Sequence, residues 1–215
     1  MKKNGIVSSA VVRRLPKYYR YLGDLEKAGK EKISSQELSE KTGFTASQIR
    51  QDLNHFGGFG QQGYGYQVSA LRQSIKEIIG LEKGYNAIIV GFGNIGQAIY
   101  KYDGFNTEKF DIIGVFDKSD YVNTGKNQDV EIKSIDEIEG FLSENEVDIA
   151  VLAVPEVVAQ EVTDMLVANG VKSIWNFAPV DVKAPEEVPV ENVHLSESLY
   201  TLIYYLGNND DYKAR

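Results

Sequence analysis

The chain has 215 residues, enough for one large domain or two small ones, and its 42% apolar and 25% charged residues are typical of a folded protein. No apolar run is long enough to span a membrane, and the first residues lack the apolar core of a secretory signal. The absence of cysteine excludes disulfides, zinc thiolate sites and thiol catalysis. A cytoplasmic protein is therefore expected. The net charge of −8 is unevenly distributed along the chain. Residues 1–83 carry 14 Lys and Arg against 8 Asp and Glu, whereas residues 84–215 carry 9 against 23. The basic first half suits a polyanion partner, or it is merely a solvated basic surface.

The first half of the chain is predicted to be mainly helical. Apolar residues recur at helical spacing over residues 8–29, where Pro16 predicts a kink or a break. Two short helices follow, and each starts with a capping box, at residues 34–37 and 45–48. Gly43 supplies a left-handed residue for the turn between them. These features predict a helix-turn-helix.

The second of these short helices has two distinct faces. If Ile49, Leu53 and Phe56 are buried, the residues that point away from the core carry groups that hydrogen-bond base edges and phosphates. These expected DNA-binding residues are Ser47, Arg50, Gln51 and Asn54. Arg14 and Lys17 on the first helix are expected to hold phosphates. A small helical domain whose polar face only meets water would show the same pattern.

The segment from residue 55 to 84 completes this half. Residues 55–68 hold five glycines among aromatic residues, which disfavours helix and predicts a glycine-rich hairpin that resembles a wing. Residues 69–84 form a further helical segment that ends at Gly84.

From Tyr85 onward, strand and helix patterns alternate, which predicts a parallel sheet covered on both faces. Strands are expected at 86–90, 110–117, 147–155, 171–177 and 190–195, and helices at 94–102, 134–146, 156–170 and 196–206. The last helix carries Leu199, Leu202, Ile203 and Leu206 along one stripe beyond the final strand, so a homodimer is expected to bury it.

The most specific motif is a glycine-rich loop between the first of these strands and its helix. Gly91 permits a tight turn, Gly93 lets a pyrophosphate approach the backbone, and Gly96 lets helix and strand pack closely. The expected cofactor-binding residues are Gly91, Phe92, Gly93, Asn94, Ile95, Gly96 and Asp117. Asp117 ends the next strand, where a carboxylate meets the adenosine ribose hydroxyls and repels a 2′-phosphate, so NAD is favoured over NADP. A structural glycine turn followed by a capping aspartate is the alternative.

Six motifs follow one another in the chain: RRLPKYYRYL, SSQELSEKTGFTASQIRQDL, GYGYQV, VGFGNIGQAIYKY, VLAVPEVVAQEV and IWNFAP. In this order, and over nearly the whole chain, they resemble the Rex family of redox-sensing transcriptional repressors. The resemblance implies a homodimer with a swapped C-terminal helix, which binds palindromic double-stranded operator DNA with NAD⁺ or no nucleotide and is released by NADH. It implies an α/β fold with a winged helix-turn-helix domain at 1–84, a Rossmann-type NAD(H)-binding domain at 85–195 and a dimerisation helix and tail at 196–215.

The resemblance also implies roles for individual residues. Arg50, Gln51 and Asp52 match the family's recognition triplet. Tyr102 matches a tyrosine near the nicotinamide, and Pro155, within the VLAVPEVV motif, is expected to bind cofactor. Arg20 matches an arginine that changes partners in the switch, and His194 stands where the family usually has an aspartate that pairs with that tyrosine or arginine.

Three residues or pairs depart from the family pattern. Gln51 replaces a lysine and Gln61–Gln62 replace basic wing residues, which suggests altered operator preference or weaker non-specific affinity. His194 cannot form the carboxylate–arginine pair, so the switch is expected to be weaker or pH-dependent.

Two other classes of function compete with the repressor. An NAD-dependent oxidoreductase with an accessory helical domain needs a proton donor near the hydride site, but little chain remains for a substrate domain and neither Tyr102 nor His194 stands in a recognisable catalytic arrangement. A scaffolding protein leaves both the glycine motif and the basic half unexplained. The sequence therefore favours a repressor that is not an enzyme and binds no metal.

Overall fold

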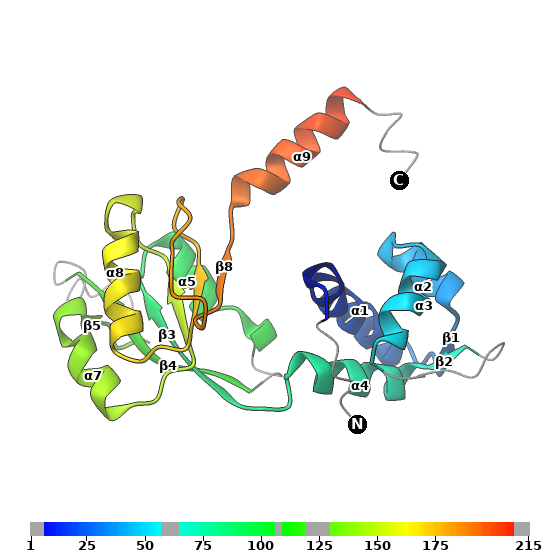
Figure 1. Cartoon of the computed structure of the whole chain (residues 1–215), viewed down its shortest axis with the longest axis horizontal. Coiled ribbons are helices and arrows are strands. Elements are labelled where there is room, and N and C mark those ends of the chain that lie inside the picture. The colour runs from blue at the N-terminus through cyan, green and yellow to red at the C-terminus, as the bar shows by residue number, and fades with distance from the viewer. Residues whose placement is uncertain (1–6, 57–64, 106–108, 119–129, 209–215) are drawn as a thin grey trace. The chain divides into compact units, whose positions relative to one another are not determined.

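The computed structural model describes residues 7–56, 65–105, 109–118 and 130–208 (Figure 1). The chain divides between Lys83 and Gly84 into two compact units. No helix of the described residues is long and apolar enough to cross a membrane.

The first unit is a small helical domain with one short antiparallel strand pair. Its elements are α1 (Ser9–Lys27), β1 (Lys32–Ile33), α2 (Ser35–Thr42), α3 (Ala46–Asn54), β2 (Tyr66–Gln67) and α4 (Val68–Ile79). One buried cluster joins all four helices and β1: Leu15, Tyr18, Leu22, Ile33, Leu38, Ile49, Leu53, Val68, Leu71 and Ile75. The helix-turn-helix therefore rests on α1 and α4 through a common apolar core.

Local signals explain most of the helix ends in this unit. The capping box at Ser34 is complete, because its side chain accepts from the Glu37 N–H while the Glu37 carboxylate accepts from the Ser34 N–H. At Thr45 the side chain accepts from the Gln48 N–H, which is one half of the predicted box. Gly43 adopts the predicted left-handed conformation, with φ 75°.

Three expectations about this unit need correction or fall outside the structure. α1 continues through Pro16 as one helix, so the chain does not break there. α4 ends at Ile79, because Gly80 with a φ of 83° caps the helix before the expected end at Gly84. Residues 57–64, which hold most of the expected hairpin including Gln61 and Gln62, lie outside the described residues, while β2 beyond them pairs with β1.

The second unit is a six-stranded parallel sheet with helices in several of the connections between its strands. Its elements are β3 (Tyr85–Val90), α5 (Asn94–Tyr100), η1 (Asp103–Phe105), β4 (Phe110–Asp117), β5 (Lys133–Ser134), η2 (Ile135–Glu137), α7 (Ile138–Glu144), β6 (Ile149–Leu152), α8 (Glu156–Ala168), β7 (Ser173–Asn176), β8 (Val190–Asn192) and α9 (Leu195–Gly207). The strand order is β5-β4-β3-β6-β7-β8 and every neighbouring pair is parallel. This is the Rossmann order, and the direction of winding reverses between β3 and β6.

Both faces of the sheet are covered (Figure 1). Ile88 and Val90 of β3 belong to the cluster that contains α7 and α8 residues, whereas Ile89 belongs to the cluster that contains Ile99 of α5. Alternate residues of one strand are thus buried on opposite faces, as expected for a parallel sheet between helices. β3 consequently lies at the centre of the unit, and its carboxyl end leads directly into the glycine-rich loop.

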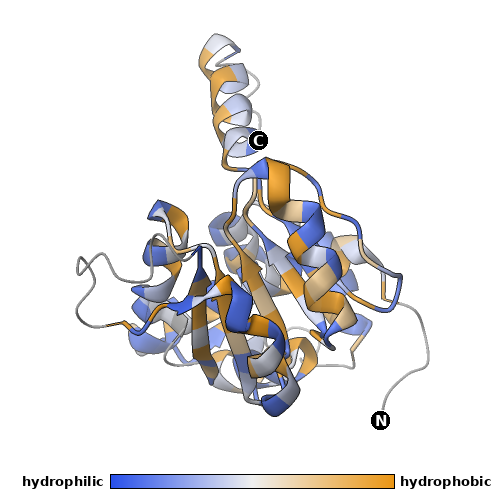
Figure 2. Cartoon of the chain, turned by 90° about the vertical axis from the view of Figure 1, so that its left-hand side faces the viewer, coloured by the Kyte–Doolittle hydropathy of each residue, from blue (hydrophilic) through white to orange (hydrophobic). Residues whose placement is uncertain are grey.

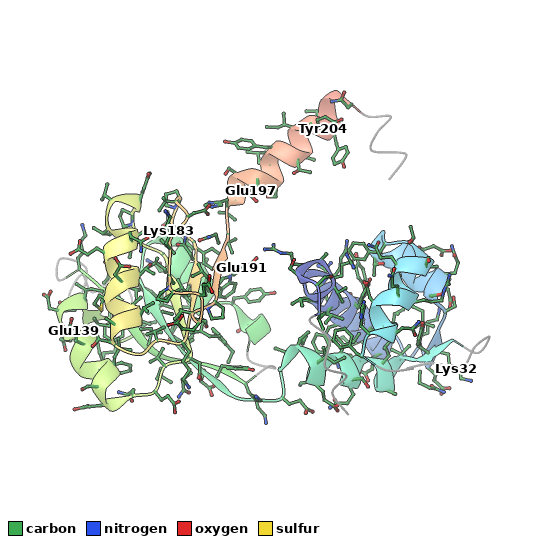
Figure 3. All side chains as sticks on the ribbon, in the orientation of Figure 1. Lys32, Glu139, Lys183, Glu191, Glu197 and Tyr204 are labelled. Carbon is green, nitrogen blue, oxygen red and sulfur yellow. The ribbon has the colours of Figure 1, made fainter. Side chains whose placement is uncertain are left out.

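Helix α9 follows β8 and has no buried residue in the single chain. Figure 2 shows its apolar residues in orange, and Figure 3 shows Glu197 and Tyr204 pointing away from its ribbon. Seven large apolar side chains on α9 are each between 52% and 83% exposed, and they are Leu195, Leu199, Tyr200, Leu202, Ile203, Tyr204 and Leu206. An apolar helix of this kind is normally buried against a partner.

Candidate nucleotide pocket and nucleic-acid interface

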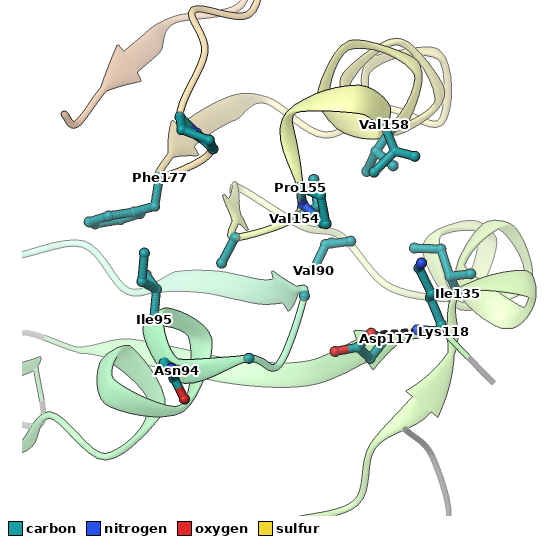
Figure 4. Close-up of a pocket in the computed structure, with 15 residues that line it drawn as sticks. Val90, Asn94, Ile95, Asp117, Lys118, Ile135, Val154, Pro155, Val158 and Phe177 are labelled. Atoms are coloured by element: carbon teal, nitrogen blue, oxygen red, sulfur yellow. Dashed lines mark hydrogen bonds between the residues drawn. The ribbon is translucent and has the colours of Figure 1, made fainter. Parts of the chain in front are cut away.

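A cavity of about 600 Å³ lies at the carboxyl ends of β3, β4 and β6, where the sheet reverses its winding (Figure 4). Open α/β sheets bind ligands at such a position, and this volume lies in the usual range for cofactor pockets. The lining residues are Val90, Gly91, Gly93, Asn94, Ile95, Asp117, Lys118, Ile135, Ala153, Val154, Pro155, Val158, Val162, Phe177 and Pro179.

Each of the three glycines of the motif is required for a different structural reason. Gly91 has a φ of 94°, and a Cβ there would lie 2.4 Å from the carbonyl oxygen of Ala153. A Cβ on Gly96 would lie 2.1 Å from the Gly91 carbonyl oxygen, so Gly96 packs beneath the turn. A Cβ on Gly93 would meet nothing within 4 Å, because Gly93 borders the cavity. The open backbone at Gly93 is where a pyrophosphate can approach, and the site therefore fits a dinucleotide.

Asp117 is held at one end of the pocket by the backbone. Its Oδ2 accepts from the Phe92 N–H and its Oδ1 accepts from the Lys118 N–H, both at 2.6 Å. Figure 4 shows Asp117 and Lys118 at one end and Ile95 and Phe177 at the other. Each carboxylate oxygen can accept a further bond from a ribose hydroxyl.

The ionisable side chains among the described pocket-lining residues are Asp117 and Lys118, which lie together. The end near Ile95 and Phe177 is lined by apolar groups and by Asn94, whose amide is neutral, so a bound nicotinamide ring there would have no acid or base from this lining (Figure 4). The geometry suits binding of a dinucleotide better than hydride-transfer chemistry. No group of three or more acidic or histidine side chains in the described part of the chain could hold a metal ion.

The pocket includes most but not all of the expected cofactor residues. Gly91, Gly93, Asn94, Ile95, Asp117 and Pro155 line it. Phe92 contributes its backbone N–H, while its ring is buried edge-on against Tyr100 at 5.7 Å. Gly96 supports the turn from below, and Tyr102 lies outside the lining, 59% exposed. The sequence missed Lys118, although its position at the carboxyl end of a strand beside Asp117 was a usable signal.

The residues expected to form the switch occupy both units. Arg20 belongs to the first unit, where its guanidinium lies over the Tyr21 ring at 4.9 Å. Tyr102 and His194 belong to the second. His194 Nε2 lies 2.8 Å from Asp181 Oδ1, so its imidazole is already paired with a carboxylate of its own unit just before α9 begins.

In the first unit, α3 presents the face that its spacing predicted. Ile49 and Leu53 are buried, and the four candidate DNA-binding residues Ser47, Arg50, Gln51 and Asn54 are all exposed. Arg50 donates to Ser35 Oγ at 2.8 Å, which holds its guanidinium near the start of α2. The exposed face offers amide, hydroxyl and guanidinium groups for base edges.

Arg14 is engaged differently from the other candidates. Its Nε and Nη2 donate to Asp52 Oδ2 and Oδ1 at 2.6 and 2.8 Å, and Tyr18 donates to Asp52 Oδ2 at 2.7 Å. The hydrogen bond to Asp52 raises the pKa of Arg14, and burial raises the pKa of Tyr18, so both stay protonated donors. This geometry argues against a phosphate-binding role for Arg14, whereas Lys17, whose Nζ lies 4.8 Å from the centre of the Phe44 ring, stays a predicted phosphate contact.

Asp52 belongs to the Arg50–Gln51–Asp52 triplet that carries part of the family resemblance, but it was not among the residues expected to face DNA. It is 2% exposed, and its environment was not predicted. The signal was present, because at about 100° per residue Asp52 lies only about 60° from Ile49, on the buried face. Its partner Arg14, 38 residues away, could not be identified from local spacing.

Family models match both units. Residues 6–54 match a putative DNA-binding protein N-terminus, and residues 82–180 match a CoA binding domain. A redox-sensing transcriptional repressor Rex from Clostridium perfringens is 53% identical over 209 residues, which cover 97% of this chain and 98% of the relative. One from Clostridium acetobutylicum is 57% identical over 202 residues, 94% of each chain.

Solved structures show the same similarity. A crystal structure of RSP in complex with beta-NAD⁺ and operator DNA has a TM-score of 0.87 and 51% identity, with coverage of 98% of this chain and 97% of that one. RSP in complex with beta-NADH has a TM-score of 0.88 and 48% identity, with coverage of 98% and 99%. Both units of this chain therefore have counterparts in one solved protein.

Proposed function

The chain belongs to the Rex family of redox-sensing transcriptional repressors, and we propose on this premise that its first unit binds operator DNA and its second unit binds NAD(H). It is a repressor, not an enzyme, and NADH releases it from the operator as the NADH/NAD⁺ ratio rises. The observation that carries the proposal is the presence in one chain of a dinucleotide-sized pocket at the sheet's switch point and a helix-turn-helix with an exposed polar face.

The nucleotide is proposed to lie along the glycine-rich loop. Its pyrophosphate follows the backbone at Gly93, and its adenosine ribose hydroxyls bond Asp117. Asn94, Ile95 and Pro155 border the same cavity and complete the contacts. The carboxylate of Asp117 disfavours a 2′-phosphate, so NAD(H) is the expected ligand rather than NADP(H).

The DNA contacts are proposed to come from α3 and α1. Arg50 and Gln51 read base edges in the major groove, with Ser47 and Asn54 beside them. Lys17 on α1 holds a phosphate and fixes the register. Gln51 cannot supply the charge of a lysine, so this chain is expected to show weaker salt-dependent affinity than relatives with a basic residue at that position.

The protein is proposed to act as a cytoplasmic homodimer on a palindromic operator. Helix α9 is exposed and apolar in the single chain, and a second copy of the chain is its proposed partner through a swap of the residue 196–215 segment. A two-fold dimer presents two copies of α3, which matches two half-sites separated by one or more DNA turns. Residues 1–84 and 85–195 are the proposed DNA-binding and NAD(H)-binding domains.

The redox switch is proposed to involve Tyr102, Arg20 and His194. NAD⁺ and NADH differ by a hydride and by the charge of the nicotinamide ring, so the protein must sense charge or ring shape there. His194 is engaged with Asp181 and brings no carboxylate of its own, and the affinity difference between the two nucleotide states is therefore expected to be smaller than in relatives with aspartate at this position.

The proposal is tested by fluorescence anisotropy with a labelled palindromic duplex that the wild-type protein has selected from a random library. Operator affinity is measured at saturating NAD⁺ and at saturating NADH, with a scrambled duplex of equal composition as the control. Weaker operator binding with NADH is expected. Equal affinity with both nucleotides would reject redox sensing, and equal affinity for both duplexes would reject specific DNA binding.

A further inference from the structure

A buried carboxylate lies in the middle of the helix proposed to read DNA. Asp52 follows Gln51 on α3, but Gln51 is exposed whereas Asp52 is 2% exposed and lies on the buried side of the helix together with Ile49 and Leu53. Burial of a carboxylate is unfavourable unless it is paired and fully hydrogen-bonded. The residues that satisfy Asp52 therefore indicate what its position in α3 does.

Asp52 is held by two donors from one turn of α1. The Arg14 fork donates from Nε and Nη2 to the two carboxylate oxygens at 2.6 and 2.8 Å, and Tyr18 donates to Oδ2 at 2.7 Å. A two-point arginine–carboxylate contact fixes the plane of the carboxylate as well as its distance. Three directional bonds thus fix the rotation of α3 about its axis and its position along α1.

The turn before α3 is part of the same arrangement. The Phe44 ring lies edge-on to the Tyr18 ring at 5.7 Å, and the guanidinium carbon of Arg14 lies 5.8 Å from the Phe44 centroid. Apolar side chains could fill this space with equal or greater stability, because a buried ion pair often contributes less than a well-packed apolar substitute. The hydrogen bonds of the charged cluster are directional and so constrain the orientation of α3. Apolar packing against Ile49 and Leu53 does not supply such a constraint.

We propose that Asp52, held by Arg14 and Tyr18, is a positioning residue that sets the orientation of α3 so that Arg50 and Gln51 reach base edges. This inference rests on the proposed DNA-binding function. Hydrogen bonds to bases need a donor–acceptor distance within a few tenths of an ångström of about 2.9 Å, so a small rotation of α3 reduces base discrimination before it unfolds the unit. Arg14 contributes alignment and no phosphate contact, because Asp52 matches its charge.

The main test is the double variant Arg14→Met/Asp52→Leu, which removes one charge of each sign and fills the site with apolar groups. We expect a folded protein with wild-type NADH affinity. The ratio of its affinities for the selected operator duplex and the scrambled duplex should fall at least about tenfold, since base contacts carry that ratio. The dependence of scrambled-duplex affinity on salt should stay as in wild type, whereas loss of a phosphate contact would lower that log–log slope by about 0.9.

Two further variants keep the test decisive. Arg14→Lys retains the charge beside Asp52 but lacks the planar fork, so it should fold and still lose operator discrimination. Lys17→Met is the matched control, for which we expect weaker binding to both duplexes, a smaller salt slope and unchanged discrimination. Unchanged discrimination in the double variant or in Arg14→Lys, or a reduced slope in the double variant, would overturn the inference. A wild-type protein that does not prefer its selected duplex would instead overturn the proposed function.

Discussion

Gly93→Val tests the nucleotide pocket with only a modest effect on the stability of the fold. Gly93 has a φ of −71°, which valine adopts readily, and a Cβ there would meet nothing within 4 Å. Because Gly93 is also the N-cap of α5, where glycine is preferred to valine, we expect the free energy of unfolding to fall by only about 1 kcal/mol. The added methyl groups would occupy cavity space where the pyrophosphate must approach the backbone. We expect the affinity for NADH to fall by about 100-fold or more, equivalent to about 2.7 kcal/mol.

The assay compares unfolding with and without NADH. At a concentration of about 100 times the wild-type Kd, NADH should stabilise the wild-type protein by about 2.7 kcal/mol, but a variant with 100-fold weaker affinity by only about 0.4 kcal/mol. Gly140→Val is the matched control, because Gly140 also has room for a Cβ but lies on α7 outside the pocket lining. Equal stabilisation of Gly93→Val and wild type by NADH would refute the reasoning.

Other regions of the chain give three more predictions. Arg50→Ala should weaken operator binding by about 1–3 kcal/mol and relax base preference, and a uniform loss across single-base operator variants in competition assays would contradict base reading. A chain that ends after Leu195 should be monomeric in light scattering, because it lacks all the exposed apolar side chains of α9 except Leu195; a stable dimer would place the interface elsewhere. Hydrogen bonds from Lys30 and the Ser34 backbone lower the pKa of Glu37 from 4.5 to about 2, so the stabilisation by this carboxylate is present above about pH 4.5 and is lost as the pH falls toward 2. Glu37→Gln keeps a capping-box side chain without this titration, so its melting temperature should fall less than that of wild type between about pH 5 and pH 3, and an equal fall would contradict the assignment.

Local signals made much of the fold predictable. The order of strands and helices after Tyr85 follows from their alternating patterns, and the parallel six-stranded sheet confirms the Rossmann prediction. The short strand β5 was missed, because two residues carry no periodicity and Lys133–Ser134 is a strand only through its pairing with Phe116 and Asp117. Of the kink or break predicted at Pro16, the break does not occur, and the buried residues Leu15 and Tyr18 anchor α1 on either side of the proline.

The candidate sites also combine contacts that the sequence predicted with contacts that it did not. The glycine-rich loop and Asp117 lie within about 30 residues of one another, so a single βαβ unit brings them together, and the sequence was sufficient to predict that they border one pocket. The ion pair of Arg14 with Asp52 joins two helices, and His194 pairs with Asp181, which lies in the loop between β7 and β8. Such pairs depend on tertiary packing, which local periodicity does not encode.

Coupling between the two proposed sites makes one further demand on the protein. If NADH lowers operator affinity by some factor, the operator must lower NADH affinity by the same factor, because both factors describe one thermodynamic cycle. NADH titrations of the free protein and of the protein saturated with its selected duplex measure the second factor, and anisotropy with and without NADH measures the first. We expect the two factors to agree and to exceed the corresponding factors for NAD⁺. If operator DNA leaves NADH affinity unchanged while NADH still weakens DNA binding, the release would come from something other than the equilibrium between these two sites.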